Sequence, residues 1–191
     1  MNCSKLIAMN IGGDTCASNV AGYRSKAVVL NFEDIVDVVR NTDNPHIVEE
    51  ITLAEGKFGY YVEQRGAKRF DGSNGTMAQG TYENTITNGV VFQVPFDATT
   101  TNNFTQPLLN GGEVVIILES KSKGVDGKSA FEIYGLDQGL TMTAGERNVN
   151  DERGKYISMT VSETTTSAGD FLFNESYAAT KAMVESLVKK S

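Results

Sequence analysis

The sequence has little of what enzyme sites and metal centres need. Its 191 residues include no tryptophan, three prolines, one histidine and two cysteines, Cys3 and Cys16. The cysteines do not form a Cys-x-x-Cys pair, so we expect no structural zinc site. We interpret them as free thiols in a reducing compartment, with a local disulfide near the N-terminus as the alternative. The chain is long enough to bury a core without disulfides or metal, and we expect no cofactor.

The single histidine, His46, is a poor candidate for a ligand or a catalytic base. Glu49 and Glu50 follow it at the spacing that would place all three on one helix face. Pro45 and the β-branched residues nearby favour a strand, in which Glu49 and Glu50 point to opposite faces. We therefore expect His46 to lie at the surface or in a turn.

Catalytic sequence motifs are also missing. Gly127-Lys128-Ser129 ends like a phosphate-binding loop, but the first glycine of that motif is replaced by Ser122. The next residues, Phe131 to Tyr134, read as a strand and not as the helix that such a loop opens. No Gly-x-Ser-x-Gly or His-Glu-x-x-His motif occurs. These absences predict that the protein is not an enzyme, and that Lys128 is an exposed residue in a hairpin turn.

Long apolar runs and basic patches are absent too. The longest apolar runs, such as 114–118, are far shorter than the roughly 20 residues of a membrane span. Residues 1–5 are not followed by the apolar stretch of a secretory signal, so we expect none. The formal net charge is -7 and basic residues are scattered. A sequence-specific nucleic-acid binder normally has a basic face, so we expect neither a membrane nor sequence-specific binding to nucleic acid.

What the sequence does contain is a series of short strand patterns separated by turns. Residues 57–64 and 89–97 alternate apolar and polar residues, with Val90, Phe92, Val94 and Phe96 inward in the second. Residues 113–119 are apolar on both faces, which predicts a central strand covered on both sides. The other predicted strands are 26–30, 47–53, 130–134 and 155–161. Seven or eight strands at this spacing predict a sandwich or barrel.

Helical patterns are few. The apolar residues of 33–40 have helical spacing, although a valine-rich segment also suits a strand. A helical turn is expected near 106–109, stopped by Gly111-Gly112. Residues 175–190 predict a helix with Asn174 as its cap. One apolar stripe of this helix should pack on the domain, and it consists of Ala179, Met183, Leu187 and Val188.

Two polar segments break the strand rhythm. Residues 1–25 are small and polar and predict an extended N-terminal arm that could pack on a neighbouring subunit. Residues 65–88 are polar and glycine-rich, and structureless segments of this length are usually functional or flexible. We therefore expect a β-sandwich or barrel-like domain over 26–173, with a long loop at 65–88 and a C-terminal helix over 174–191. Candidate subunit contacts in or near that loop are Arg65, Lys68, Arg69, Phe70, Asp71 and Tyr82.

An acidic β domain with an N-terminal arm, a long loop and no recognisable group of catalytic residues is typical of an assembly subunit. The order of its segments resembles the tail-tube (major tail) proteins of tailed phages and related virion proteins, especially those of phages of Bacteroides-type hosts. The resemblance covers roughly residues 26–165. The segments that carry it are 28–34, 58–64, the loop to Asn88, Phe92, 113–118, 131–140 and 150–157.

The resemblance implies a barrel-like sandwich that forms hexameric rings, stacked into a tube through which DNA passes. The loop at 65–88 would then bridge adjacent rings. The partners of the whole protein would be other copies of the same chain and other virion proteins. The protein would be located in the virion, and in the host cytoplasm during assembly. An acidic or neutral lumen avoids the lysine and arginine contacts that hold DNA. Net charge -7 fits that need, with Glu63 and Glu132 as candidate outward-facing carboxylates.

Two other classes stay open at this stage. The same domain could be an auxiliary capsid or head-decorating protein that binds a capsid lattice mainly through its N-terminal arm. It could also be a soluble β-rich binding module or an enzyme, which would need a pocket with convergent polar groups. No such group is apparent in the sequence.

Overall fold

Two β-sheets, with a helix packed on one of them, make up the described part of the chain. The structure is a computed structural model that describes residues 21–64, 69–71, 73–151 and 154–189. It is 50% strand and 17% helix. The mainly-β, sandwich-like class predicted from the strand patterns is confirmed.

The larger sheet has seven strands and holds β7 near its middle. Its neighbouring strands pair antiparallel, except that β11 pairs parallel with β3. Its spatial order is β2 (Ile35–Arg40), β3 (Ile47–Leu53), β11 (Asp170–Leu172), β8 (Phe131–Tyr134), β7 (Val114–Ser120), β1 (Tyr23–Asn31) and β4 (Tyr60–Glu63).

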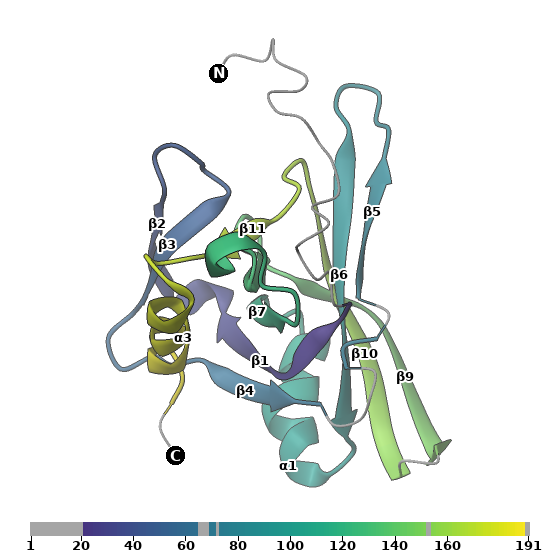
Figure 1. Cartoon of the computed structure of the whole chain (residues 1–191). Helices are drawn as coiled ribbons and strands as arrows, with labels where there is room; N and C mark the ends of the chain where they lie inside the picture. Colours follow the sequence, from purple (N-terminus) through teal and green to yellow (C-terminus); the bar gives the residue numbers. More distant parts are fainter. Residues whose placement is uncertain (1–20, 65–68, 72, 152–153, 190–191) are drawn as a thin grey trace.

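The smaller sheet has four antiparallel strands and stands on the right in Figure 1. Its spatial order is β5 (Asn74–Ala78), β6 (Thr85–Pro95), β10 (Gly154–Thr165) and β9 (Thr141–Asp151). Strands β5 and β6 form a hairpin that projects beyond the rest of the molecule at the top of Figure 1.

One apolar core fills the space between the two sheets. From the smaller sheet, Val90, Phe92 and Val94 of β6 alternate inward, and so do Ile157, Met159 and Val161 of β10. The strand pattern predicted this alternation, and it is confirmed. The larger sheet contributes alternate residues of β1 and β7, namely Ala27, Val29, Val114, Ile116 and Leu118.

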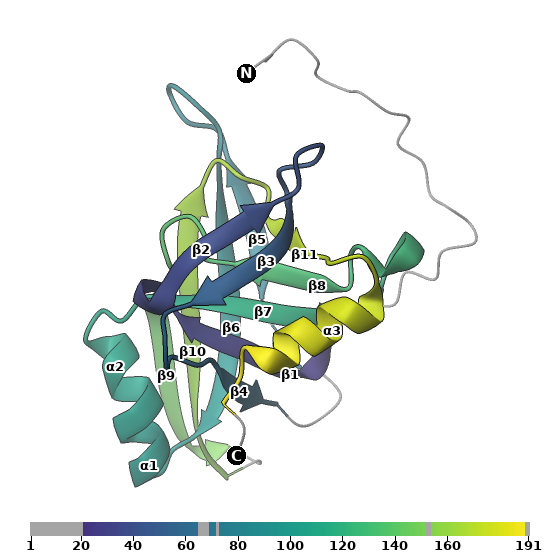
Figure 2. The same ribbon diagram turned by 90° about the vertical axis from the view of Figure 1, so that its left-hand side faces the viewer.

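A second core lies on the other face of the larger sheet, under α3 (Tyr177–Ser186). Val115 and Ile117 of β7 point into it, so β7 is buried on both faces as its sequence predicted. Figure 2 shows α3 crossing in front of this sheet. Leu187 and Val188 are buried there, Met183 packs against them, and Ala179 is half-buried.

A helical segment closes one end of the space between the sheets. It comprises α1 (Ala98–Thr100), a π-helical stretch η2 (Thr101–Thr105) and α2 (Gln106–Leu109). The Asp97 side chain caps it by accepting the Thr100 N–H at 2.8 Å. Leu108 is buried in the inter-sheet core and Phe104 packs against it. The predicted helical turn at 106–109 is therefore the end of a longer helical segment.

The prediction of a long loop over 65–88 is wrong. Residues 74–78 form β5, and β6 begins at Thr85, four residues before the predicted strand start at Gly89. Residues 65–68 and 72 lie outside the described residues. All of β5 is exposed, so it carries no apolar alternation that would have marked it as a strand. The register Thr76 opposite Thr87 instead holds it to β6 through backbone pairing.

The helical interpretation of 33–40 is also wrong. Phe32–Asp34 form one 3₁₀ turn, η1, and β2 follows at Ile35. The β-branched residues of β2 pair with β3, for example Val38 opposite Ile51. Packing of β-branched side chains on a pleated surface overrides the helical spacing.

The predicted boundaries at both ends need correction. Residues 1–20 of the expected arm, with Cys3 and Cys16, lie outside the described residues, whereas Tyr23 to Ser25 already belong to β1. At the other end Ser176, and not Asn174, caps α3, because its hydroxyl accepts the Ala179 N–H at 3.2 Å. After α3 the chain bonds to Gly59: the Gly59 N–H donates to Leu187 O at 2.7 Å.

We expect Leu187→Ala to lower the free energy of unfolding by about 2 kcal/mol or more, because it opens a cavity under α3. Urea unfolding monitored by circular dichroism measures this. Lys181→Ala, an exposed change on the same helix, is the matched control and should change stability by less than about 0.5 kcal/mol. Equal stability of the two variants would contradict the packing described for α3.

Candidate functional site: an uncovered sheet and its hairpin

The outer face of the four-stranded sheet is not covered by any other element of the described chain (Figure 1). Side chains alternate across a strand, so the face opposite Phe92 and Met159 consists of their neighbours in the sequence. Val91 and Gln93 of β6 are on this face, but many of the others carry hydroxyl groups. The hydroxyl-bearing residues include Thr76 of β5, Thr85 and Thr87 of β6, Ser158, Thr160, Ser162 and Thr164 of β10, and Thr143 of β9.

The hydroxyl groups bond to one another across the strands. Thr87 Oγ1 and Thr164 Oγ1 lie 2.9 Å apart, and the Ser162 hydroxyl donates to Thr143 Oγ1 at 3.0 Å. Cross-strand hydroxyl pairs of this kind stabilise a sheet modestly and leave the remaining lone pairs to water. The face is therefore polar, regular and hydrated.

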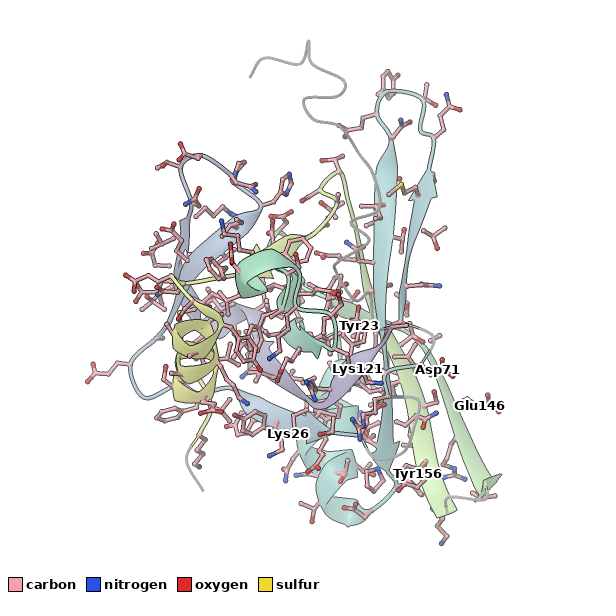
Figure 3. All side chains as sticks on the ribbon, in the orientation of Figure 1. Tyr23, Lys26, Asp71, Lys121, Glu146 and Tyr156 are labelled. Atoms are coloured by element: carbon pink, nitrogen blue, oxygen red, sulfur yellow. The ribbon has the colours of Figure 1, made fainter. Side chains whose placement is uncertain are left out.

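Charge is almost absent from this face. By the strand register, Glu146 opposite Ser158 places a carboxylate on it. Figure 3 shows Glu146 on the side of the sheet that points away from the seven-stranded sheet. Among the residues whose side chains are described, no lysine or arginine lies on this face: Arg147 of β9 points to the other side, where its guanidinium covers the Phe96 ring at 4.8 Å. The described part of this face therefore lacks the cations that bind phosphate groups.

Within the described residues, both edges of this sheet are unpaired. In the described chain β5 and β9 each pair on one side alone, with β6 and β10. The edge strand β9 is 11 residues long, and all its described side chains from Thr143 to Val149 are exposed. Unpaired N–H and C=O groups along such an edge are a template for another strand.

The tip of the β5–β6 hairpin carries exposed apolar side chains. Tyr82 is 99% exposed and Met77 is 78% exposed. Aromatic residues and methionine are over-represented at protein interfaces. Single exposed apolar residues are common on protein surfaces, but these two share one projecting hairpin.

The predicted contact residues around this hairpin fall into four groups. Arg65 and Lys68 lie outside the described residues, and Tyr82 and Asp71 are exposed. Phe70 is different, because it is buried in the inter-sheet core and contacts the edge of the Phe92 ring. Arg69 is half-buried and its Nε atom has no hydrogen-bond partner. The structure therefore corrects Phe70 from a subunit contact to a core residue, and separates it from Tyr82.

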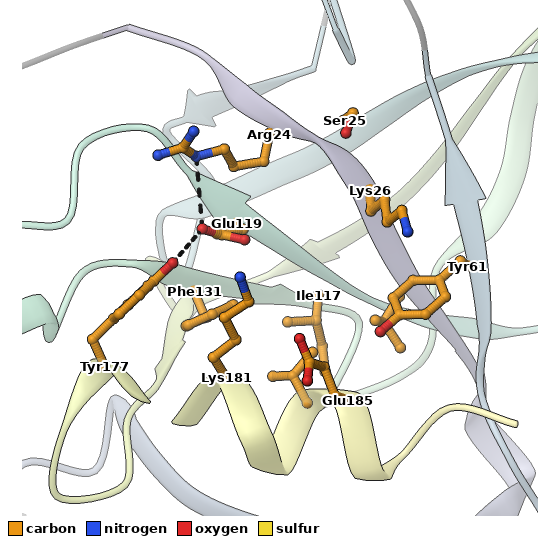
Figure 4. A pocket seen from close by; sticks show the side chains of 12 residues that line it. Arg24, Ser25, Lys26, Tyr61, Ile117, Glu119, Phe131, Tyr177, Lys181 and Glu185 are labelled. Atoms are coloured by element: carbon orange, nitrogen blue, oxygen red, sulfur yellow. Dashed lines mark hydrogen bonds and ion pairs between the residues drawn. The ribbon is translucent and has the colours of Figure 1, made fainter. Parts of the chain in front are cut away.

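A polar groove runs between α3 and the adjacent end of β1, with a volume of about 420 Å³. Figure 4 shows Arg24 and Tyr177 meeting on Glu119. Arg24 Nε lies 3.7 Å from Glu119 Oε1, and the Tyr177 hydroxyl donates to the same oxygen at 2.7 Å. Burial, followed by the bond to Glu119, raises the pKa of Tyr177 to about 12. Among the described residues, those that line this groove include no histidine or cysteine.

A partly buried carboxylate, Glu132, lies on the side of the seven-stranded sheet that faces the smaller sheet. Glu132 accepts hydrogen bonds from the Tyr23 hydroxyl at 2.7 Å and the Tyr134 hydroxyl at 2.6 Å. Burial raises the pKa of Tyr23 to about 12 and raises that of Tyr134 further. Both phenols therefore stay protonated donors at neutral pH. Glu132 faces inward in this arrangement, so the expectation that it points outward toward a lumen is wrong.

A buried carboxylate, Glu163 of β10, lies where the chain turns from β8 to β9. Its Oε1 accepts the Gly135 N–H at 2.8 Å, and its Oε2 is buried without a hydrogen-bond partner. Burial raises the pKa of Glu163 above its ordinary value, and the charges of Asp137 and Asp170 raise it further.

Metal-ligand and membrane-spanning features are not found in the described chain. No group of three histidine, cysteine, aspartate or glutamate residues lies in an arrangement that could hold an ion among residues 21–64, 69–71, 73–151 and 154–189. His46 is half-exposed, and its Nδ1 lies 3.4 Å from Asp170 Oδ1. None of the helices in these ranges is both long and apolar enough to cross a membrane.

Sequence reasoning missed the hydroxyl face and the β9 edge. The alternation of Thr85, Thr87 and Gly89 with Ile86 and Asn88 was the available signal for the longer β6. The residues of β9 are predominantly polar, so they show no alternation of apolar and polar residues that would predict a strand. Comparison of the chain with protein-family models, with curated proteins and with solved structures found no match.

We expect the stability difference between Glu163→Gln and the unmodified protein to depend on pH. Folding raises the pKa of Glu163. Ionisation of this carboxyl group therefore lowers the free energy of unfolding as pH rises above the ordinary glutamate pKa. That cost is absent at lower pH, so the variant should gain stability relative to the unmodified protein between pH 4 and pH 7. Urea unfolding at several pH values measures the difference. Glu146→Gln, at an exposed carboxylate of the same sheet, is the control, and an equal trend in both variants would contradict the assignment to Glu163.

Proposed function

We propose that this protein is a virion structural subunit, specifically a tail-tube protein whose copies form stacked rings that conduct DNA. The observation that carries the proposal is the four-stranded sheet with two open edges and an uncovered face of hydroxyl groups. This sheet would line the passage. The seven-stranded sheet and α3 would form the outer wall, since they lie on its opposite side.

The open edges support ring formation. Strand β9 of one copy can pair with β5 of the next, and a head-to-tail contact of this kind repeats until the rotation closes a ring. Each copy then completes the hydrogen bonding of its neighbour's edge. Rings of this kind would extend the four-stranded sheets of all copies into one closed sheet.

The hydroxyl face supports DNA transit. Duplex DNA binds proteins largely by exchanging its condensed counterions for lysine and arginine. The described outer face of the sheet carries hydroxyl groups and the Glu146 carboxylate. Water bound to the hydroxyl groups can contact a moving phosphate backbone without holding it.

Electron microscopy of the purified full chain in negative stain, with its mass from light scattering, tests the proposal. Hollow tubes or stacked rings are expected. A chain that stays monomeric at high concentration and instead binds isolated phage capsids would overturn the tail-tube proposal in favour of a capsid-decorating subunit. A chain that stays monomeric and does not bind capsids would overturn a virion role.

We expect Val149→Lys to reduce ring formation at least about tenfold, because a lysine on β9 blocks pairing along this edge. Val149 is 50% exposed, so the monomer should fold normally. The matched control is Val36→Lys on β2, the edge strand of the other sheet, where valine is 61% exposed. Light scattering should show assembly of the control variant. Assembly of Val149→Lys to the same extent would contradict pairing through β9.

A further inference from the structure

Cations gather on the surface beside α3, although the whole chain carries a formal net charge of -7. Arg24 and Lys26 of β1 and Lys181 of α3 line the groove between these two elements, the α3 groove. Figure 4 shows Lys26 and Lys181 extending from opposite sides toward the space between β1 and α3. Lys123, in the connection from β7 to β8, lies beside the same groove, because it covers the ring of the lining residue Tyr177.

Aromatic rings, and not carboxylates, are the partners of two of these lysines. Lys26 Nζ lies 5.1 Å from the centre of the Tyr61 ring, and Lys123 Nζ lies 3.5 Å from the centre of the Tyr177 ring. An ammonium group on a ring face is held in place without losing its charge. Within the described residues, neither of these lysines forms an ion pair with a carboxylate, and Lys181 forms none either. The charge of all three is therefore available to an anionic ligand.

The carboxylates of the α3 groove limit which anion fits there. Glu119 is already engaged, since it accepts the Tyr177 hydroxyl and lies 3.7 Å from Arg24. Glu185 of α3 is exposed and lines the same groove. A phosphate dianion is repelled by such carboxylates and offers them no N–H donor. An acidic peptide offers carboxylates to the lysines and backbone N–H donors to Glu185, so a peptide suits this mixed lining better than a phosphate group does.

The size and the inner lining of the groove also suit a short peptide segment. Its volume of about 420 Å³ lies within the range of ordinary ligand sites. Buried apolar side chains of the core under α3 form its innermost lining, namely Val28, Ile117, Phe131 and Val184. One apolar side chain of a ligand can contact this lining while acidic neighbours on either side reach the lysines.

We propose that the α3 groove binds an acidic peptide segment of a partner protein, in which an apolar residue is flanked by aspartate or glutamate. The carboxylates of the segment pair with Lys26, Lys123 and Lys181. The groove lies on the α3 side of the seven-stranded sheet, and the hydroxyl face belongs to the other sheet. The inference therefore goes beyond the proposed function and does not depend on ring formation.

Fluorescence anisotropy of a labelled synthetic peptide tests the binding to the full chain. The probe is Glu-Glu-Leu-Glu-Glu, and Lys-Lys-Leu-Lys-Lys is the control peptide of equal length. We expect saturable binding of the acidic probe alone, and weaker binding at high ionic strength, because salt screens exposed charges. Absence of binding at low ionic strength, or equal binding of the two peptides, would overturn the inference.

Charge reversal in the groove locates the site. Lys181→Glu should weaken binding of the acidic probe at least about fivefold, because it replaces an attractive charge by a repulsive one. Lys155→Glu, at an exposed lysine of β10 in the other sheet, makes the same change in net charge and should alter binding less than about twofold. Lys181→Arg keeps the charge and should retain binding. Equal weakening by Lys181→Glu and Lys155→Glu would show general attraction to the chain and overturn the site.

A competing ligand class is separated in the same assay. An oligothymidylate of the same length as the peptide carries phosphate groups without carboxylates or peptide N–H groups. Tighter binding of this oligonucleotide than of the acidic probe would overturn the choice of a peptide ligand. None of these outcomes decides the tail-tube proposal, which depends on the rings or tubes seen by electron microscopy.

Discussion

Burial of one strand on both faces is the constraint on which the rest of the structure depends. Residues 114–118 of β7 are all buried, alternately in the inter-sheet core and in the core under α3. A strand of this kind needs a cover on each side, because either face left bare would expose a row of large apolar side chains. The four-stranded sheet is one cover and α3 is the other. The free outer face of the small sheet follows from this layering, since that sheet has a single apolar side.

The parts of the fold that were predictable are those where burial leaves a period in the sequence. Strands β6 and β10 showed it, and their inward residues are confirmed; the burial of β7 on both faces is confirmed as well. Residues 33–40 gave a helical spacing that strand pairing overrode. The pairing partners themselves could not be predicted, because neighbours such as β11 and β3 are more than a hundred residues apart.

The candidate surfaces were only partly predictable, for a physical reason. An assembly surface that waits for a partner stays polar or exposed in the single chain, so its residues carry no burial pattern. Tyr82 was predicted to be a subunit contact; it is exposed on the β5–β6 hairpin, and its role as a contact stays a prediction. Phe70 was grouped with it because both lie between predicted strands, yet Phe70 packs against Phe92 in the core. Only the fold separates a polar hairpin from a polar loop.

The attachment of α3 also affects the order in which the fold can be completed during synthesis. The chain after α3 bonds to Gly59, and β11 enters the large sheet between β3 and β8. Both segments come late in the sequence, and their partners come early or in the middle. A ribosome therefore releases most of the chain before the large sheet and its outer cover can form. Contacts of such long range make folding slow. A newly made chain therefore exposes the open edges of the small sheet while the large sheet is still incomplete, and a chaperone would be of use during that period.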